Sequence, residues 1–446
     1  MKTKQSIYPA GATNANWFSA FNALSFQITL GSPIILYVKS IGATATILGI
    51  VAALPPLMMI CQIPAAHFLA KVGYRRFIFS GWGLRTVCIF LISAVPLMGF
   101  LGNLNKLVLI LFALFLFNLL RGISSGAWLP WLTDLIPEDV RGRFLSRDQI
   151  FLHAGCLVSL GLGAVLLYGG AGSWQFSLLF FISALAAVVS LLFLRKTPDV
   201  DARDVVSRSG MRVPWRDILF HPPFLRLVVF TLLFVLALGA GGVFGVAFMK
   251  SRLGFTDSQI MFFGVFYFLG ALLSLPFAGK ILDRTGSKMA IEHTMISFCL
   301  LQFAWWMLSA GLLPPSASLI IALHFIGGIV GSNFSLAFTR LMMNTMPPMG
   351  RSHFFALYSV ISSLGAAIAP LFWGMMIDSL DHLDYSLGPV HFGKYSVFYL
   401  ASLVMTCVTL ALAFTLQEKE HPGGRITVRE LLYTANLKRI SRFWQR

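Results

Sequence analysis

Residues 279–288 of the chain read Gly-Lys-Ile-Leu-Asp-Arg-Thr-Gly-Ser-Lys, and residues 66–76 read Ala-His-Phe-Leu-Ala-Lys-Val-Gly-Tyr-Arg-Arg. The two stretches share their pattern of small, apolar and basic residues at an offset of about 211 residues. Two further pairs of segments repeat in similar register, namely 37–42 with 248–254 and 137–144 with 347–354. Three pairs at the same loop of each half indicate an internal duplication, because self-similarity at a fixed period marks repeated structural units.

The composition is typical of a membrane protein. Of the 446 residues, 57% are hydrophobic and 11% are charged, and the mean hydropathy is +0.79. A soluble domain averages about 45–50% apolar and about 25% charged residues, so this chain has too few charges to cover a surface that faces water. The five cysteines lie in apolar stretches without a CxxC pair, which excludes a disulfide framework or a zinc ribbon.

Apolar runs long enough to cross a bilayer, about 20 residues each, divide the chain into two sets of six. The runs are 17–38, 45–69, 77–101, 106–132, 149–169, 174–194, 224–249, 259–282, 290–312, 317–346, 354–377 and 395–416. A polar, proline-containing linker separates the sixth run from the seventh. We therefore expect an N-terminal six-helix bundle at 1–196, a cytoplasmic linker at 197–223, a C-terminal six-helix bundle at 224–417 and a basic cytoplasmic tail at 418–446.

The basic residues fall on one side of these runs. Lys and Arg number 34 against 17 Asp and Glu, for a net charge of +17. Of the 34, 26 lie at the N-terminus, in the even-numbered loops and in the tail, whereas five lie in odd-numbered loops and three within runs. The positive-inside rule then predicts that both termini are cytoplasmic. The high pI reflects topology rather than nucleic-acid binding, and we expect a multi-pass protein of a bacterial inner (plasma) membrane.

On its repeated motifs, the sequence resembles the major facilitator superfamily of secondary transporters over about residues 14 to 417. Segment 279–288 is similar to that superfamily's loop G-x-x-x-D-R-x-G-[RS]-[RK], whereas the first copy has Ala66 and Ala70 in place of the glycine and the aspartate. The resemblance implies an all-α membrane protein with 12 transmembrane helices in two six-helix bundles. Each bundle would consist of 3+3 inverted repeats, with a central cavity between the bundles.

The resemblance also implies a cytoplasmic latch between the two halves. In relatives, the aspartate of this loop accepts hydrogen bonds at a helix N-terminus, where unpaired N–H groups and the helix dipole favour a carboxylate. Asp283 and Arg284 would form the intact latch near Arg147, and the copy with Ala70 lacks the carboxylate. The gating candidates are Gly279, Asp283, Arg284, Gly286, Lys71, Gly73, Arg75 and Arg147.

Arg121 is the deepest ionisable residue of the apolar runs. It lies 13 residues before Asp134 and 15 after Lys106, roughly 20 Å from either end at a rise of about 1.5 Å per residue. A guanidinium matches carboxylate or phosphate, and mid-membrane charges are costly. An anion-binding or proton-coupling centre is therefore one interpretation, and a structural arginine satisfied by helix carbonyls or by Asn118 is the other.

Other polar residues in the runs complete the candidate site. Arg85 and Arg340 lie nearer the cytoplasmic ends, and we expect both to extend toward water. For the asparagines and glutamine, hydrogen bonding between helices is an equal alternative to substrate contact, and His324 is either a titratable group or a packed histidine. The substrate-binding candidates are Arg121, Asn118, Asn22, Gln27, Trp128, His324 and Asn333.

The carboxylates are informative by their position. All seventeen lie outside the runs or at their ends. Carboxylate relays are the usual proton device of transporters, so their absence argues against simple cation or proton symport. Facilitated diffusion, anion exchange, and coupling through Arg121 with a histidine or with the substrate's own proton stay open.

A competing interpretation comes from the predicted external loop between Asp378 and His391. It contains three carboxylates and two imidazoles, which are ligands that suit divalent iron, manganese or zinc. The spacing matches no fixed metal motif, so a solvated acidic loop is the other interpretation.

We therefore predict a secondary active or facilitative transporter that moves a small polar solute, anionic or neutral, by alternating access. Its expected partners are a small-molecule substrate, the lipid bilayer and a coupling proton or exchanged anion; we expect a monomer with no cofactor and no nucleic acid. The alternatives are a drug/proton antiporter, a divalent metal-ion carrier and a transport-inactive membrane scaffold or sensor. We expect no enzyme, since the sequence has no phosphate loop, HExxH motif or Ser-His-Asp arrangement.

Overall fold

A computed structural model describes residues 9, 11–62, 64–65, 72–136, 138–199, 220–345 and 351–418. By Cα proximity the chain forms two compact units. The first unit comprises Met1–Arg212, Gly239–Val265 and Ser359–His382, and the second comprises Val213–Leu238, Phe266–Tyr358 and Leu383–Arg446.

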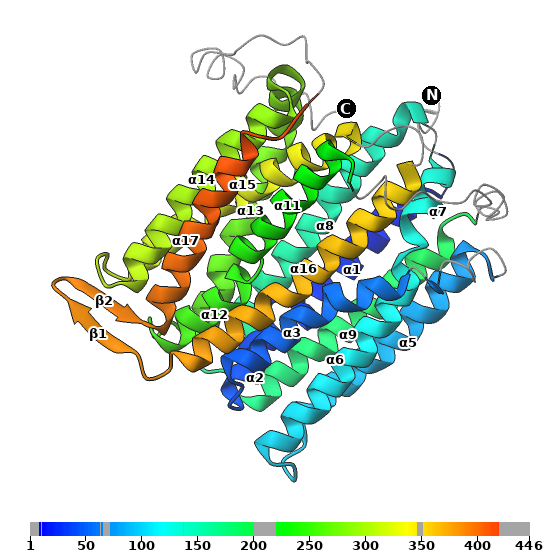
Figure 1. Cartoon of the computed structure of the whole chain (residues 1–446). Coiled ribbons are helices and arrows are strands. Elements are labelled where there is room, and N and C mark those ends of the chain that lie inside the picture. The colour runs from blue at the N-terminus through cyan, green and yellow to red at the C-terminus, as the bar shows by residue number, and fades with distance from the viewer. Residues whose placement is uncertain are drawn as a thin grey trace, which may run out of the picture. The chain divides into compact units, whose positions relative to one another are not determined.

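Helices make up almost all of the first unit (Figure 1). They are α1 (Thr13–Leu30), α2 (Ser32–Ser40), α3 (Ala45–Met58), η1 (Met59–Cys61), α5 (Tyr74–Ala94), η2 (Val95–Leu97), α6 (Asn103–Ser125), α7 (Trp128–Leu135), α8 (Glu138–Leu166), α9 (Ser173–Lys196) and α12 (Gly241–Ser251). The start of α13 (Asp257–Thr285) and most of α16 (Arg351–Ser379) belong to this unit as well.

The second unit contains four further helices and a short hairpin. The helices are α11 (Pro222–Leu238), α14 (Ser287–Ser309), α15 (Ala317–Thr345) and α17 (Lys394–Ala413). The strands β1 (Asp384–Leu387) and β2 (Val390–Gly393) pair antiparallel, with Asp384 opposite Gly393. This hairpin leads directly into α17 (Figure 1). The sequence analysis did not predict it.

Ten helices of the described residues are long and apolar enough to cross a membrane. All twelve predicted runs overlap helices, and two of them fall outside these ten. The second run is the shorter Ala45–Cys61, where Pro55 and Pro56 lack backbone donors and the helix tightens into η1. The ninth run is α14, whose sequence includes the polar residues Glu292, His293 and Gln302.

The first span of each half consists of two helices that meet end to end. α1 ends at Gly31, and Pro33 in the first turn of α2 lacks the N–H that a continuous helix would use. At the matching place of the second half, α11 ends at Leu238 and α12 begins at Gly241. The predicted runs 17–38 and 224–249 lie within the candidate spans Thr13–Ser40 and Pro222–Ser251, and the structure adds a helix break inside each.

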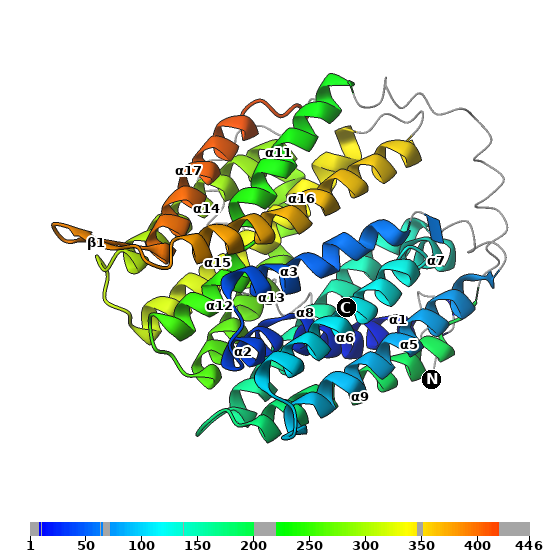
Figure 2. The same ribbon diagram turned by 60° about the horizontal axis from the view of Figure 1, so that its bottom comes forward.

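Within the first unit, α1 packs against α8 and α9, α5 packs against α6 and α9, and α3 packs against α6 (Figure 2). Small residues allow close approach at two of these contacts. A Cβ atom on Gly155 would overlap the carbonyl of Ala20, and one on Gly122 would overlap the carbonyl of Met58. Helix–helix contacts in membranes rely on such small residues, because lipid supplies no hydrophobic force between helices.

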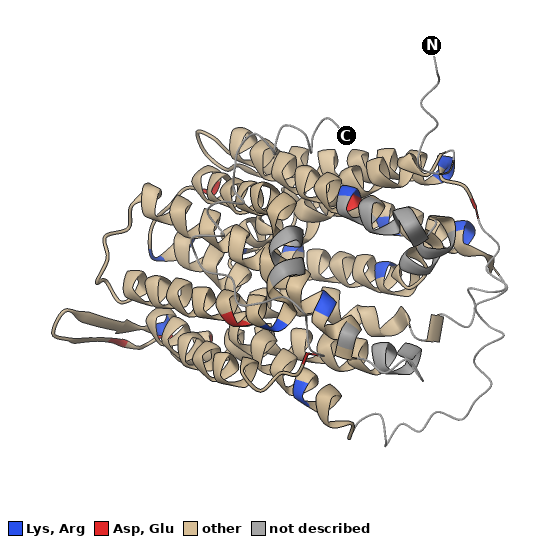
Figure 3. Cartoon of the chain, turned by 90° about the horizontal axis from the view of Figure 1, so that it is seen from above, with Lys and Arg blue, Asp and Glu red and all other residues tan. Residues whose placement is uncertain are grey.

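The interior of the second unit is a cluster of phenylalanines. Phe334 of α15 stacks on Phe234 of α11 with ring centroids 4.2 Å apart, and Phe298 of α14 meets Phe334 edge to face at 5.7 Å. Phe230 and Phe338 extend the cluster. In Figure 3, most of the ribbon is tan, and Lys, Arg, Asp and Glu colour only short segments of it. The charged residues that do lie inside the helices therefore need an explanation.

Candidate functional site

Arg85 is buried in the interior of the first unit. It lies on α5, and its side chain has a relative exposure of 3%. One guanidinium N–H donates to Oδ1 of Asn22 on α1, and the guanidinium carbon lies 4.7 Å from the ring centre of Trp82 and 5.5 Å from that of Phe117. The expectation that Arg85 extends toward water was wrong, because an amide and two aromatic faces enclose the charge. Cation–π contacts of this kind stabilise a desolvated guanidinium.

Arg121 lies on α6, four residues after Phe117, and so on the same face of that helix. The ring of Phe117, one turn before Arg121, lies 5.5 Å from the guanidinium carbon of Arg85, so the two like charges are neighbours and repel each other. Within the part of the chain that the structure describes, the guanidinium of Arg121 has no hydrogen-bond or ion-pair partner. The sequence prediction placed Arg121 at a functional centre, and the structure adds Arg85 as its neighbour.

Several polar atoms of this centre have no partner among the described residues. They are Nε of Arg85, Nε1 of Trp82 and Oδ1 of Asn118, all of which are shielded from solvent. The amide nitrogen of Asn118 donates to the carbonyl of Leu114 at 2.8 Å, one turn back on its own helix. Asn118 therefore does not satisfy Arg121, and the centre has more donors than acceptors. Unpaired donors in a dry interior are costly.

A buried carboxylate of this unit is already hydrogen-bonded elsewhere. Asp148 lies near the start of α8 with an exposure of 6%, and Oδ1 accepts a hydrogen bond from Asn16 at 3.4 Å. Ser19, one turn further along α1, donates to the same carboxyl group. Neither arginine forms an ion pair with Asp148 in the described structure. The positive charge of Arg85 and Arg121 is thus left without a counter-ion from the described chain.

Aromatic side chains cover the centre on one side. Trp128, at the start of α7, lies 4.7 Å from Phe18 and 5.8 Å from Trp82 between ring centres. Phe18 stacks on Trp82 at 4.9 Å with nearly parallel rings. Trp128 therefore belongs to the same aromatic cluster as Trp82. Gln27 lies on α1 and is half-buried, with its side chain against Gly31.

The two candidates on α15 belong to the second unit and bond to their own helix. His324 Nδ1 lies 2.9 Å from the carbonyl of Ile320, and its ring meets Trp305 edge to face at 5.8 Å. The amide of Asn333 donates to the carbonyl of Ile329 at 2.7 Å. Side-chain bonds to the carbonyl four residues back are a common way to satisfy polar residues inside helices.

The glycines of the repeated motif have a clear structural role. Gly73 precedes α5 with φ of 83°, and Gly286 precedes α14 with φ of 79°. Residues other than glycine rarely adopt this left-handed region. Each glycine therefore turns the chain into the next helix, which explains why both copies of the motif keep it.

The remaining gating candidates are only partly described. Lys71 lies outside the described residues, and so do the side chains at positions 279, 283 and 284, although these three positions lie within α13. The predicted latch of Asp283 with Arg147 stays a prediction. Arg147 is exposed and lies over the ring of Phe151 at 5.6 Å.

Each half has one contact of a carboxylate at a helix end that the sequence analysis missed. Arg75 at the start of α5 pairs with Asp199 after α9, with Nε and Oδ2 3.4 Å apart. At the start of α14, the backbone N–H groups of Ser287 and Lys288 donate to the carboxylate of Glu418 at 3.0 and 2.7 Å. In both halves, a carboxylate that follows the sixth span reaches the start of the third. Only the repeat register could have suggested this pairing.

Asp378 caps the first turn of α3. It lies at the helix ends that carry the odd-numbered loops. Its two carboxylate oxygens accept hydrogen bonds from the backbone N–H groups of Ala45 at 2.9 Å and Thr46 at 2.7 Å. The adjoining backbones touch, since a Cβ atom on Gly49 or Gly374 would overlap the facing carbonyl. α3 therefore runs alongside the second half of α16 (Figures 1 and 2).

Asp378 is thus a helix cap, which argues against the metal-binding interpretation of this loop and for the other one. No group of three or more His, Cys, Asp or Glu residues in the described ranges could hold a metal ion. Asp384 and His391 lie diagonally across the hairpin, with Oδ1 and Nδ1 3.6 Å apart. The loop between Asp378 and His391 consequently divides into a capping residue and a surface hairpin.

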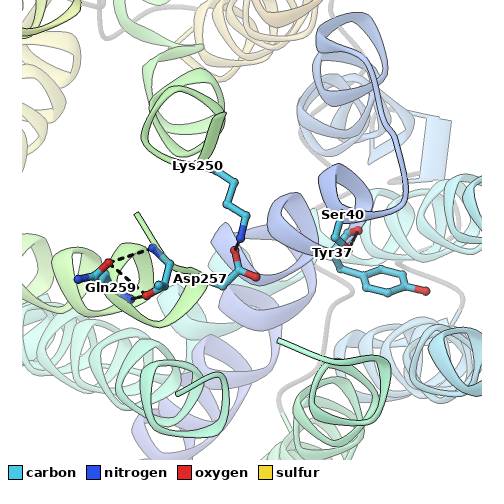
Figure 4. Close-up of polar contacts among 6 residues, drawn as sticks. Tyr37, Ser40, Lys250, Asp257 and Gln259 are labelled. Carbon is cyan, nitrogen blue, oxygen red and sulfur yellow. Dashed lines mark hydrogen bonds and ion pairs between the residues drawn. The ribbon is translucent and has the colours of Figure 1, made fainter. Parts of the chain in front are cut away.

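An ion pair between Lys250 and Asp257 lies where α12 ends and α13 begins in the first unit (Figure 4). Lys250 at the end of α12 contacts Asp257 at the start of α13, with Nζ and Oδ1 2.5 Å apart, and Asp257 is only 4% exposed. Next to it, the hydroxyl of Ser258 donates to the carbonyl of Ala164 on α8 at 2.6 Å. These contacts tie α12, α13 and α8 together where the helices end.

The apolar helices define an integral, multi-pass membrane protein of the all-α class. The model of the Major Facilitator Superfamily matches residues 17–249 and 229–444, which together cover almost the whole chain. The chain belongs to the major facilitator superfamily.

Solved structures share this fold at low sequence identity. A variant of the nucleoside transporter NupG is 12% identical with a TM-score of 0.68, over 92% of this chain and 99% of that one. A POT family transporter in complex with 5-aminolevulinic acid is 13% identical with a TM-score of 0.69, over 92% and 97%. The inward-open xylose transporter XylE from E. coli is 15% identical with a TM-score of 0.64, over 93% and 96%. No curated protein sequence matches the chain.

Proposed function

We propose that the protein is a secondary transporter that moves a small polar solute, anionic or neutral, across its membrane by alternating access. The observation that carries the proposal is the centre formed by the buried Arg85 and the half-buried Arg121 and Asn22, which α5, α6 and α1 hold inside a helical membrane unit. An ionisable group at this depth is costly unless it binds something. The similar structures include transporters of nucleosides and of xylose, which are small polar solutes.

The charge of the centre supports the preference for an anionic or neutral solute. A cation would meet two guanidinium groups and, in the described part of the unit, a carboxylate that Asn16 and Ser19 already occupy. The same argument disfavours a divalent metal-ion carrier and a drug/proton antiporter for cationic drugs. Both would need free carboxylates where this chain has arginines.

Transport is tested by solute flux into proteoliposomes, after a thermal-shift screen of purified protein has selected a solute from organic anions, sugars, drugs and divalent metals. We expect Arg121→Ala to abolish the flux while the yield of folded protein stays unchanged, since the residue has no partner in the described structure whose loss would unfold it. Arg195→Ala, at the exposed end of α9, is the matched control and should transport normally.

Normal flux through the Arg121→Ala variant would remove Arg121 from the site. If no solute moves through the wild-type protein, a membrane scaffold or sensor built on the same fold becomes the better assignment.

Alternating access also needs contacts that break at one membrane face at a time, and we propose that Asp378 provides one of them. The carboxylate holds α3 against α16 at the predicted non-cytoplasmic end. Asp378→Asn should weaken this contact, because a neutral amide interacts less with the helix dipole and offers one acceptor instead of two. Spin labels at Ile50 and Ser379 should then report a broader, longer distance distribution. Asp381→Asn, in the next turn, is the control.

The counterpart prediction concerns the other membrane face. Asp283→Ala should shift the protein toward states that are open to the cytoplasm, if the family latch operates here. An unchanged distance distribution in either aspartate variant would contradict the role assigned to that residue.

A further inference from the structure

We infer that Arg85 and Arg121 act as a pair that binds one anionic group, a carboxylate or a phosphate, of an organic solute. The inference rests on the proposed function and narrows its solute from polar to anionic. It also assigns a binding role to Arg85 and Trp82, which the sequence alone did not single out.

The first step of the argument is the charge balance of the centre. Arg85 is 97% buried, and the charge of Arg121 repels it. Like charges at short range destabilise each other, and Arg85 has in addition lost its water, whereas Arg121 is half-buried. Within the described residues, no carboxylate pairs with either one. An anion bound between the two would supply the missing charge.

The second step is the supply of hydrogen-bond donors. Asn22 accepts one N–H of Arg85, which leaves the Nε–H of the same guanidinium without an acceptor. The indole N–H of Trp82, whose ring lies under that guanidinium, is also without an acceptor. These two N–H groups are fixed donors, and the guanidinium of Arg121 adds further donors, which is the set that recognises carboxylate and phosphate oxygens.

The third step is rigidity. Trp82 and Phe117 hold the guanidinium plane of Arg85 at 4.7 and 5.5 Å, and Phe18 is stacked on Trp82 in turn. Asn22 fixes one edge of the same plane. Arg85 therefore loses little freedom on binding, which favours affinity. Arg121, which nothing in the described structure holds, can adjust to the anion.

The test measures anion binding by detergent-purified protein. We would titrate acetate, succinate and inorganic phosphate, with xylose as the neutral probe, and follow the melting temperature and the heat of binding. We expect saturable stabilisation by at least one anion and none by xylose. Arg85→Gln and Arg121→Gln should each weaken anion binding by about tenfold or more, the effect of losing a charge-assisted hydrogen bond.

Three variants separate binding from a structural role. Arg121→Gln should raise the melting temperature of the anion-free protein, because it removes the repulsion with Arg85. Trp82→Phe keeps an aromatic ring at this position but removes the indole N–H together with the five-membered ring, so it should weaken anion binding several-fold without loss of fold. These two variants keep the test valid if Arg85→Gln fails to fold. Arg195→Gln is the control and should bind like the wild type.

Two outcomes would overturn the inference. The first is that the arginine variants bind anions as well as the wild type does. The second is that only anionic phospholipid, added to delipidated protein, stabilises it, which would make the pair a site for a lipid headgroup.

Flux measurements keep this inference distinct from the proposed function. Anion binding that needs both arginines but no flux would support the inference and overturn transport. Flux of a neutral solute without anion binding would support transport and overturn the inference.

Discussion

Helices α5 and α14 occupy the same place in the two halves of the chain but carry different interiors. Each begins after a glycine with positive φ, Gly73 or Gly286, and twelve residues later stands Arg85 in α5 and Phe298 in α14. Arg85 meets an amide and two aromatic rings, whereas Phe298 packs against Phe234 and Phe334. The same backbone element therefore holds a charge in one half and a hydrocarbon ring in the other.

The difference indicates that the duplication preserved the backbone arrangement of the two halves but not the side chains of their interiors. At the helix ends, the two halves stay similar, since Arg75 with Asp199 and the start of α14 with Glu418 join equivalent elements. Around Arg85, the first half holds the unpaired N–H groups of Arg85 and Trp82, whereas the equivalent place in the second half is filled by stacked phenylalanines. We interpret the first half as the one that binds the charged group of the solute.

The largest expected effect on stability comes from placing an arginine in the second half at position 298, which corresponds to Arg85 in the first half. Phe298→Arg should lower the free energy of unfolding by about 3 kcal/mol, the typical cost of an arginine in the middle of a membrane helix. In contrast to Arg85, the new charge would lie among the rings of Phe234 and Phe334, against which Phe298 packs. The measurement is the unfolding of purified protein in detergent, supported by the yield of monodisperse protein.

Phe298→Leu is the matched control and should cost less than about 1.5 kcal/mol, as apolar replacements of similar volume do. If Phe298→Arg is as stable as Phe298→Leu, the second half tolerates a charge at this position. The contrast between the two interiors would then be accidental.

A smaller effect is expected where the two halves agree. Glu418→Gln should lower the free energy of unfolding by about 1 kcal/mol, since it replaces the carboxylate that caps two backbone N–H groups of α14 by a neutral amide. Asp199→Asn should cost less than about 0.5 kcal/mol, because its ion pair with Arg75 is more than a third exposed on both sides. Amide hydrogen exchange at Ser287 and Lys288 should rise only in the first variant. Equal costs for both variants would mean that the two ends are held in the same way, and not by a cap in one and a surface pair in the other.

Sequence patterns were sufficient for most of the fold. The twelve apolar runs all overlap helices, and the repeated motif predicted the equivalence of α5 and α14 together with their glycines. The patterns did not show the break of the first span in each half, because apolarity continues through Gly31 and through Gly239. They also did not show the β1–β2 hairpin, which is a short loop feature without apolar alternation.

The candidate site was predicted in part. Arg121 was identified because its depth follows from counting residues along a helix. Arg85 was missed, because its position along α5 gives only its depth in the membrane. A long side chain at that depth can extend to water. Its burial depends on Asn22 of α1 and Phe117 of α6, which come from other parts of the chain. The capping role of Asp378 was not predicted for the same reason, since its partners lie more than 300 residues away on α3.

The amino-acid sequence alone therefore established the membrane class, the duplication, the family resemblance and the shortage of carboxylates inside the spans. These properties depend on composition and on periods along one chain, which packing does not alter. Only the tertiary structure decided which charges share an interior, which donors lack acceptors and which carboxylates cap helices. Such properties depend on distances between helices far apart in sequence, and a few ångströms there separate a solvated arginine from a buried one in need of an anion.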